Sequence, residues 1–190
     1  MNICKPLFFL IIGFVLASCN RTYLTEEEKN WNPYKKGQKL LFKSQTGVLD
    51  SIVIEKLKYG FPDGPGFVER NEIAHIVGRN RRYKNNREVS SYIFSVYAKT
   101  KKRNSSIRFG ISLKDYYFNE SYYYDIEDYL MKLPEKTITV NNTVYSDVIK
   151  IKSAGNLSHP KDIKYIFWSK RNGFVKLEAK NGDIWELVNK

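Results

Sequence analysis

Short strand signals separated by Asn-Gly pairs dominate the last third of the chain and most constrain its fold. Residues 163–169, 174–179 and 184–188 are rich in β-branched and aromatic side chains, and Asn172-Gly173 and Asn181-Gly182 stand between them. Asn-Gly favours a tight hairpin because both residues tolerate positive φ. In the middle run, apolar and charged residues alternate, which predicts one buried and one solvated face. The sequence therefore predicts consecutive antiparallel hairpins here.

Strand signals also run through the first two thirds of the chain. They cover residues 40–42, 50–57, 88–100, 105–113, 137–140 and 144–151. Polar turns separate several of them, at 45–47 and at 101–104, and Pro and Gly mark residues 61–66 as a loop. Because no internal repeat or hinge-like linker interrupts the pattern, we expect one domain.

One α-helix is expected to interrupt the strands. Ile126, Tyr129, Leu130 and Leu133 fall at i, i+3, i+4 and i+7, which places them on one helical face. An Asp before this segment and a Pro after it would begin and end the helix. The expected fold is mainly β, a single antiparallel curved sheet or open barrel with one packed α-helix; an α+β arrangement is the alternative.

The first nineteen residues have the pattern of an export signal. Lys5 precedes an apolar run of eleven residues, Leu7 to Ala17, which is shorter than the roughly 20 residues of a membrane-spanning helix. The stretch Leu16-Ala17-Ser18-Cys19 resembles the lipobox of bacterial lipoproteins. The resemblance implies that Cys19 receives diacylglycerol, that the chain is cut before it, and that the new amine is acylated. An ordinary signal with a chance cysteine and a buried N-terminal helix are the alternatives.

This interpretation divides the chain into three parts. Residues 1–18 would be a lipoprotein signal peptide, residues 19–37 a lipidated N-terminus and tether, and residues 38–190 a single β-rich envelope domain. Thr25-Glu26-Glu27-Glu28 in the tether has the form of a capping box. We expect attachment to the cell outer membrane through the lipid, on its periplasmic side rather than on the cell surface.

Both ends of the mature chain carry a further resemblance. Trp31-Asn32-Pro33-Tyr34 stands near the start, and Tyr165 to Lys170 and Asn181 to Leu187 stand near the end. These stretches are similar to small Bacteroidota envelope lipoproteins of unassigned function. The resemblance implies a secreted β domain and brings no activity with it.

The net charge of +12 favours contact with polyanions. Export would remove nucleic acid from the expected partners and leave anionic lipid, acidic glycans or an unknown envelope protein. Basic side chains gather at both ends of the 88–100 strand, where they could bind anions or simply solvate turns. These candidate anion-binding residues are Arg79, Arg81, Arg82, Lys84 and Arg87 at one end, and Lys99, Lys101, Lys102 and Arg103 at the other.

A tyrosine cluster is the candidate glycan-contact surface. It comprises Tyr116, Tyr117, Tyr122, Tyr123 and Tyr124. Tyrosine combines a large apolar ring with a polar tip and is favoured at recognition surfaces, and its ring can stack on a sugar face. The alternative is that these rings cover the edge of the core. Adjacent tyrosines on one strand point to opposite faces, so some rings should be exposed.

A modification site and two histidines complete the candidates. Asp50-Ser51-Ile52 resembles the O-glycosylation site of Bacteroidota periplasmic proteins, in which Ser51 would carry the sugar. His75 lies in an apolar stretch and His159 precedes a proline, so we expect a satisfied, partly buried side chain and a solvated loop side chain.

No sequence motif points to catalysis. The only cysteines are Cys4 and Cys19, so the domain has no disulfide framework and no thiolate metal site. We expect no metal, no cofactor and no enzymatic activity, although acids between residues 115 and 128 could pair as in a glycosidase. Three hypotheses follow. The first is a non-enzymatic lipoprotein acting through protein or glycan contacts, the second a periplasmic carrier of lipid or another apolar ligand, and the third an envelope hydrolase.

Overall fold

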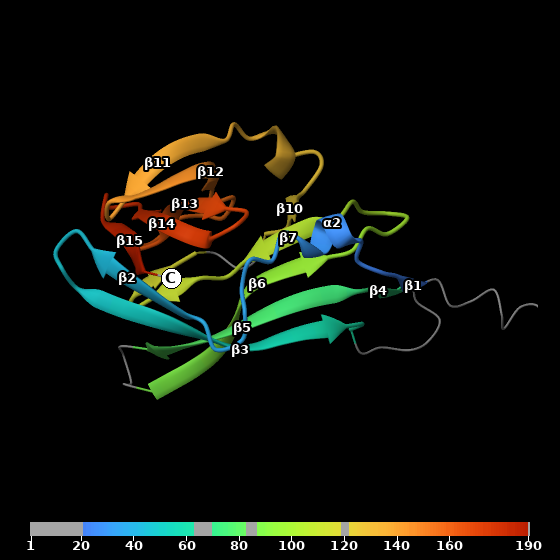
Figure 1. Ribbon diagram of the computed structural model, residues 1–190, viewed down its shortest axis with the longest axis horizontal. Helices are drawn as coiled ribbons and strands as arrows, with labels where there is room; N and C mark the ends of the chain where they lie inside the picture. Colours follow the sequence, from blue (N-terminus) through green and yellow to red (C-terminus); the bar gives the residue numbers. More distant parts are fainter. Residues whose placement is uncertain (1–20, 63–69, 83–86, 119–121, 190) are drawn as a thin grey trace, which may run out of the picture.

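The protein is built on one antiparallel sheet of eleven strands that curls round an aromatic core (Figure 1). The computed structural model describes residues 21–62, 70–82, 87–118 and 122–189. The strand order is β10-β7-β6-β5-β3-β2-β15-β14-β13-β12-β11. The C-terminal strand therefore pairs with β2, near the start of the chain, and joins the two halves of the sheet. This confirms the expected fold class of a mainly β protein with a single curved antiparallel sheet.

The strands of the large sheet agree closely with the sequence signals, apart from the two-residue strand β10 and one long strand that carries no clear alternation. They are β2 (Lys39–Ser44), β3 (Leu49–Gly60), β5 (Ile73–Arg82), β6 (Arg87–Tyr97), β7 (Ser106–Phe109), β10 (Tyr124–Asp125), β11 (Lys136–Val140), β12 (Thr143–Lys152), β13 (Ile163–Ser169), β14 (Gly173–Ala179) and β15 (Ile184–Asn189). The missed long strand is β5, in which a bulge at Ile76/Val77 shifts the register against β6 and breaks the two-residue period.

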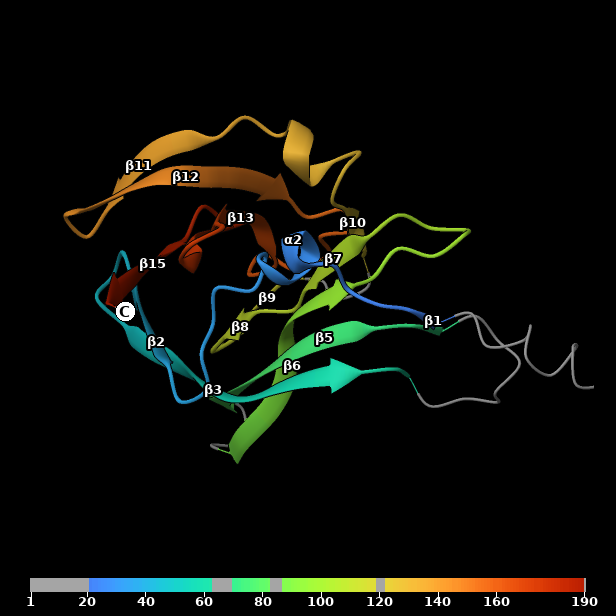
Figure 2. The ribbon, with the colours of Figure 1, turned by 45° about the vertical axis from the view of Figure 1, so that its right-hand side comes forward.

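Two small two-stranded sheets accompany the large one. β1 (Arg21–Thr22) pairs in parallel with β4 (Arg70–Asn71) at the right of Figure 1. β8 (Ser112–Leu113) pairs with β9 (Tyr116–Tyr117), which crosses the interior side of the large sheet (Figure 2).

The hairpin turns follow the expected positions, but their conformations differ from the expected one. Gly173 and Gly182 have positive φ, 79° and 89°. The asparagine before each of these glycines does not have positive φ. The two-residue turn with positive φ at both residues lies instead at Asn141-Asn142, with φ of 45° and 64°, between the paired residues Val140 and Thr143. Asparagine tolerates this conformation almost as glycine does, because its short amide can bond the local backbone.

The prediction of an α-helix over Ile126 to Leu133 is wrong. Turns lead there into a 3-10 helix, η2 (Leu130–Lys132), and among the described residues the one α-helix is the single turn α2 (Glu26–Lys29). Ile126 and Leu130 are nevertheless buried, so the apolar spacing did identify the face that packs. A segment of eight residues gains little helical stability of its own, so its conformation follows the packing of Ile126 and Leu130 in the core.

The N-terminal segment packs on the core and extends the folded body beyond the boundary expected at Gln38. Leu24, Trp31 and Tyr34 are at most 4% exposed. The expected capping box is confirmed, since Thr25 Oγ1 accepts from Glu28 N and a Glu28 carboxylate oxygen accepts from Thr25 N. Residues 24–34 are therefore part of the structured body, and a flexible tether would have to precede them.

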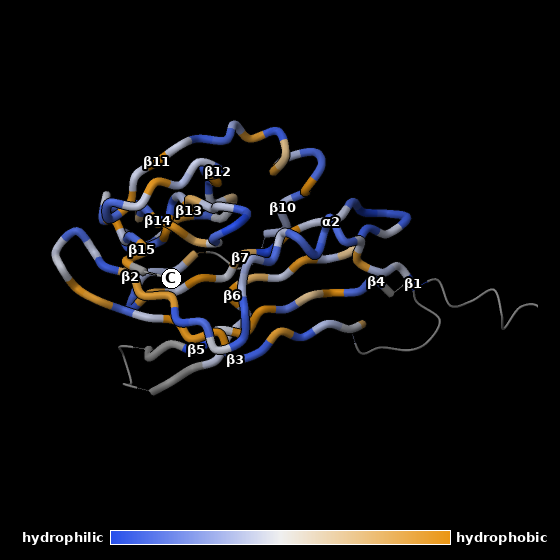
Figure 3. The backbone as a smooth tube through the Cα atoms, viewed as in Figure 1, coloured by the Kyte–Doolittle hydropathy of each residue, from blue (hydrophilic) through white to orange (hydrophobic). Residues whose placement is uncertain are grey.

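Aromatic rings fill the concave side of the sheet. The indole of Trp168 stacks on Phe94 at 4.7 Å between ring centroids, with Phe109 and Phe174 at 5.1 and 5.0 Å. All four side chains are fully buried. Hydrophobic stretches run along the inner strands in Figure 3, whereas the turns at the ends are hydrophilic. A filled interior of this kind does not favour the lipid-carrier hypothesis.

Tyr34 closes this aromatic core from the open side of the sheet. Its ring lies 5.8 Å from that of Trp168, and its hydroxyl accepts a hydrogen bond from Phe174 N at 3.0 Å. A Cβ built on Gly173 would stand 2.2 Å from the Tyr34 hydroxyl oxygen. Glycine is therefore required at position 173 both for the positive φ of the turn and for the approach of this ring.

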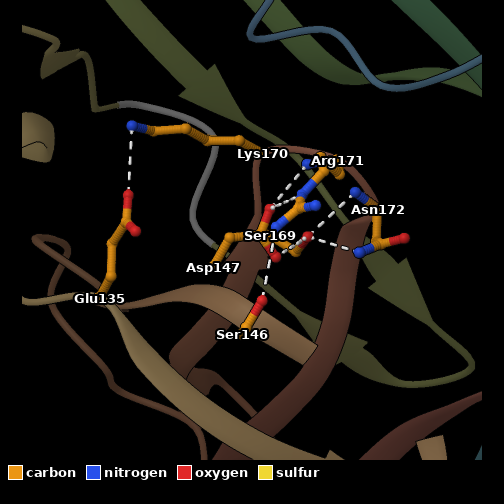
Figure 4. A network of polar contacts seen from close by, with 7 residues as sticks. All are labelled: Glu135, Ser146, Asp147, Ser169, Lys170, Arg171 and Asn172. Atoms are coloured by element: carbon orange, nitrogen blue, oxygen red, sulfur yellow. Dashed lines mark hydrogen bonds and ion pairs between the residues drawn. The ribbon is translucent and has the colours of Figure 1, made fainter. Parts of the chain in front are cut away.

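The β13–β14 turn that carries Gly173 is held by a buried carboxylate (Figure 4). Asp147 on β12 accepts from Ser169 Oγ at 2.8 Å and from Arg171 N at 3.1 Å. Ser169 Oγ in turn accepts from Asn172 N at 3.0 Å. Burial opposes ionisation of Asp147, but these hydrogen bonds outweigh it and lower the pKa of the carboxyl.

Replacing Tyr34 by phenylalanine should destabilise the protein without changing its shape. The Phe174 N–H would remain buried without an acceptor, so the free energy of unfolding should fall by about 1–3 kcal/mol. Urea unfolding followed by circular dichroism measures this difference. Tyr117→Phe is the matched control, because Tyr117 is 44% exposed, and its unfolding midpoint should not move; equal midpoints for both variants would contradict the role given to Tyr34.

Candidate functional site

Three turns and one loop enclose an open groove at the end of the molecule remote from β1. The β2–β3 turn, the β8–β9 turn and the β14–β15 turn line it together with Lys161, around a cavity of about 340 Å³. The β2–β3 turn lies at the left of Figures 1 and 2, and β1 at the right. We call this the polar groove. It is lined by Ser44, Gln45, Thr46, Val48, Lys114, Asp115, Tyr116, Lys161, Asp183 and Trp185.

The β8–β9 turn is fixed by a carboxylate of a neighbouring strand. Lys114 has φ of 48°, an uncommon conformation for a residue with a long side chain. Its N–H donates to Asp50 Oδ2 at 2.8 Å, while Ser51 N donates to the other oxygen at 2.8 Å. Burial raises the pKa of Asp50, although both hydrogen bonds act against this change. Asp50 thus positions Asp115 and Tyr116, which follow in the turn.

Asp183 is the main hydrogen-bond acceptor of the polar groove. One of its carboxylate oxygens accepts from Tyr116 Oη at 2.5 Å and from Asn181 Nδ2 at 2.6 Å, and the other from Gln45 Nε2 at 3.5 Å. The hydrogen bond from Tyr116, followed by that from Asn181, lowers the pKa of Asp183. The carboxylate is therefore ionised at neutral pH.

Lys161 is held beside Tyr116 by the backbone around it. Its neighbour Asp162 forms a bridge with Tyr117 of β9, and Asp162 O accepts from Lys180 N at 2.8 Å. The Lys161 ammonium then lies 3.2 Å from Asp115 Oδ2 and 5.4 Å from the centre of the Tyr116 ring. The groove therefore presents an ammonium, two carboxylates, an amide and an aromatic ring within a short distance of one another.

Trp185 forms part of the wall of the polar groove. Its indole packs edge-on to Tyr116 at 5.5 Å, and the side chain is 2% exposed. Trp185 Nε1 is buried and has no hydrogen-bond partner among the described residues. Buried indole N–H groups usually find a partner, so this donor is an uncompensated polar group in the wall of the groove, as Trp168 Nε1 is in the core.

The protonation states in the polar groove suit binding rather than proton transfer. Burial and the hydrogen bond to Asp183 raise the pKa of Tyr116 to about 12, so this hydroxyl stays protonated and donates. The pKa of Asp183 is shifted the opposite way. A general acid or base should titrate near the working pH, whereas the pKa values of Tyr116 and Asp183 are both shifted away from neutral pH.

The predicted tyrosine cluster divides between three surroundings. Tyr116 enters the polar groove, and Tyr117 beside it is 44% exposed. Tyr122 and Tyr123 are 44% and 46% exposed near the β6–β7 hairpin, and Tyr124 is 5% exposed. The expectation that some rings are exposed is confirmed, whereas Tyr124 is unsuited to glycan contact. Its ring packs near Phe109 and its hydroxyl donates to Lys152 O.

The two basic clusters stay apart at opposite ends of β6. Arg79 on β5 forms an ion pair with Glu55 at 3.2 Å. The backbones of Arg81, Arg82 and Arg87 lie in β5 and β6, while their side chains and Lys84 lie outside the described part of the chain. Lys99, Lys101, Lys102 and Arg103 lie at the β6–β7 hairpin, where all four are exposed.

Arg103, one of the predicted anion-binding residues, contacts Tyr123 of the predicted tyrosine cluster. The Arg103 guanidinium lies 4.9 Å from the centre of the Tyr123 ring and 5.5 Å from that of Tyr97. On the same face His75 stacks on Tyr92 at 4.3 Å, and His75 Nδ1 lies 2.7 Å from Ser95 Oγ. Burial, followed by the charges of Arg108 and Lys58, lowers the pKa of His75. The expectation of a satisfied, partly buried histidine agrees with this geometry.

The remaining predicted sites have simple locations. Ser51 is a partly exposed residue within β3, opposite Leu41 of β2. His159 is exposed in a loop, where its Nδ1 accepts from Lys161 N. Cys19 lies outside the described residues. Lipidation of Cys19 and glycosylation of Ser51 stay predictions.

The polar groove combines residues that the sequence patterns did not connect. Asp183 and Trp185 stood out only as part of the closing strand pattern, and Lys161 was not singled out by any pattern. The signal that could have indicated two of the groove residues is the position of polar residues in turns: Gln45 lies in one predicted reversal of the chain and Asp183 directly follows another.

Comparisons with known proteins supply no assignment. No protein-family model, no curated protein and no solved structure matches this chain. Within the described ranges, no helix is long and apolar enough to cross a membrane. The same residues contain no group of three or more His, Cys, Asp or Glu side chains placed to hold a metal ion.

Removing the Tyr116 hydroxyl should change the titration of Asp183. In Tyr116→Phe the carboxylate loses its largest stabilising hydrogen bond, so its pKa should rise toward the ordinary aspartate value of about 4. Carboxyl carbon NMR over a pH series measures this shift. Tyr117→Phe is the control and should leave the titration unchanged; an unchanged Asp183 titration in Tyr116→Phe would contradict the network.

Proposed function

We propose that this chain is a lipid-anchored, non-enzymatic protein of the bacterial outer membrane that binds a glycan in the polar groove. The observation that carries the glycan proposal is the convergence of Asp183, the Lys161–Asp115 ion pair and Gln45 on the ring of Tyr116, beside Trp185. Sugars present hydroxyl groups that need both donors and acceptors, and apolar ring faces that pack on aromatic side chains. Ligand sites commonly combine an apolar wall with a few convergent polar groups.

The anchor proposal is supported by the sequence Leu16-Ala17-Ser18-Cys19 after a short apolar run. Each buried acyl methylene contributes about 0.8 kcal/mol, and a single chain holds a protein only marginally. The two or three acyl chains implied by a lipobox would make attachment effectively permanent. We place the protein on the periplasmic side of the outer membrane, where its partners would be envelope glycans or proteins.

The hydrolase hypothesis has less support than binding. His75 and Ser95 form a hydrogen-bonded pair, but Ser95 is 2% exposed, so a substrate carbonyl could not approach its hydroxyl. In the polar groove, the pKa values of Asp183 and Tyr116 move away from neutrality. Neither arrangement provides an accessible nucleophile with a base ready to accept its proton.

The anchor proposal predicts the behaviour of Cys19→Ala in cells. The wild-type protein should incorporate labelled palmitate and remain with the membrane fraction in high salt. Cys19→Ala should incorporate none, because the acceptor thiol is absent. Labelling of both proteins to the same extent would contradict the proposal, and Cys4→Ala is the matched control that should behave as wild type.

The glycan proposal predicts a response of one indole. The chain has three tryptophans, so titration of the purified lipidated protein in detergent with peptidoglycan fragments and lipopolysaccharide oligosaccharides can be followed at three indole N–H NMR signals. The Trp185 signal should move, while those of Trp31 and Trp168 stay in place. Trp185→Phe assigns the signal.

Asp183→Ala should weaken this binding at least tenfold, because hydrogen bonds to a charged group contribute about 1.5–3 kcal/mol. Asp128→Ala is the matched control: Asp128 is an exposed carboxylate that pairs with Lys132 outside the groove. If no glycan moves the Trp185 signal, or if both variants bind equally well, the polar groove is not a glycan site.

A further inference from the structure

The start of the described chain and the β6–β7 hairpin form one end of the molecule. Thr22 of β1 accepts from Glu72 N at 2.8 Å, and Glu72 O accepts from Ala98 N at 3.0 Å, at the base of the hairpin. Both elements lie at the right of Figures 1 and 2. Cys19 is two residues before Arg21, which is at most about 7 Å of extended chain. A lipid on Cys19 would therefore hold this end against the membrane.

The hairpin presents cations in a fixed turn. Lys99, Lys101, Lys102 and Arg103 are all exposed, and the hairpin tip is hydrophilic in Figure 3. Thr100 orders the turn: its N–H donates to Arg103 O at 2.7 Å, and its hydroxyl accepts from Arg103 N at 3.0 Å. Residues 99–103 contain four basic side chains and no acidic one, and Lys99 forms an ion pair with Glu127 of a neighbouring segment at 3.6 Å.

Exposed aromatic and apolar side chains surround these cations. Tyr23 is 59% exposed and Met131 52% exposed, and both line a second groove of about 520 Å³ together with Thr22, Lys99 and Lys101. Glu27, Glu28 and Glu127 line the same groove, so its carboxylates outnumber its two lysines and the cationic part of this end is the hairpin itself. On the other side of the hairpin Tyr123 packs on Arg103. Tyrosine rings are favoured where an apolar layer meets water.

We propose that the β6–β7 hairpin at this end docks on the anionic phospholipid headgroups of the membrane that holds the anchor. The proposal rests on the lipid anchor of the proposed function and adds an orientation to it. Cationic side chains near an anionic surface each strengthen binding roughly fivefold, and the anchor supplies proximity. With this end on the membrane, the polar groove at the opposite end projects away from it.

Vesicle binding tests the docking surface separately from the anchor. Unlipidated Cys19→Ala protein should bind vesicles of phosphatidylcholine with phosphatidylglycerol more tightly than vesicles of phosphatidylcholine alone. Adding Lys101→Ser and Lys102→Ser should weaken this phosphatidylglycerol-dependent binding roughly 10- to 30-fold and flatten its salt dependence. All variants keep the same residues 1–18, so the difference isolates the hairpin.

The matched control is Lys35→Ser with Lys36→Ser, a second pair of adjacent exposed lysines, which should change binding less than twofold. An equal loss for both pairs would overturn the proposal, because binding would then follow net charge alone. Binding to lipopolysaccharide with none to phosphatidylglycerol would also overturn it and would make the hairpin a glycan surface. An unchanged thermal midpoint confirms that each variant is folded.

Lysine acetylation of the lipidated protein tests the orientation itself. In vesicles with phosphatidylglycerol, Lys101 and Lys102 should react about tenfold more slowly than in phosphatidylcholine vesicles, while Lys35 and Lys36 react at equal rates. If palmitate labels Cys19 but the hairpin lysines are not protected, the docking surface is wrong and the anchor stands. If palmitate does not label Cys19, the proposed anchor itself fails.

Discussion

The structure depends on filling the concave side of the curled sheet. A sheet that bends round without closing exposes its inner face unless other groups cover it, and here the rings of Trp168, Phe94 and Phe174 meet that of Tyr34. Tyr34 comes from the segment before the first long strand, so the N-terminal region completes the core. Its fit requires Gly173, whose turn Asp147 holds in place. One aromatic side chain thus links a glycine, a buried carboxylate and the burial of the N-terminal segment.

Pairing of the first and last long strands positions the polar groove. β15 pairs with β2, with Trp185 opposite Ser44, which brings the β2–β3 turn beside the β14–β15 turn. The small sheet of β8 and β9 then places Tyr116 against Trp185 and Asp183. The groove residues come from the two ends and the middle of the chain, and only the pairing of β15 with β2 and the position of the small β8–β9 sheet make them neighbours.

The two proposed surfaces lie at opposite ends of the same sheet. Strand β6 ends at the cationic hairpin beside β1, and the turns of the polar groove lie at the other end (Figure 1). A rigid sheet between them would keep the groove at a constant distance from the membrane. The hydrogen bonds from Thr22 through Glu72 to Ala98 connect the anchor end directly to the sheet, so the orientation would not depend on a long linker.

Local sequence patterns were enough to predict the class of fold, most strands and the positions of the hairpins, because alternation and Asn-Gly turns act between neighbouring residues. They also predicted the capping box at Thr25. Tertiary packing set the conformation of residues 126–133, where turns and a 3-10 helix place Ile126 and Leu130 in the core, because so short a segment gains little helical stability of its own. Only the tertiary structure separated buried Tyr124 from exposed Tyr123, since both have the same local pattern. Local sequence patterns could not predict the polar groove either, because Asp183, Tyr116 and Lys161 become neighbours through strand pairing over long sequence distances.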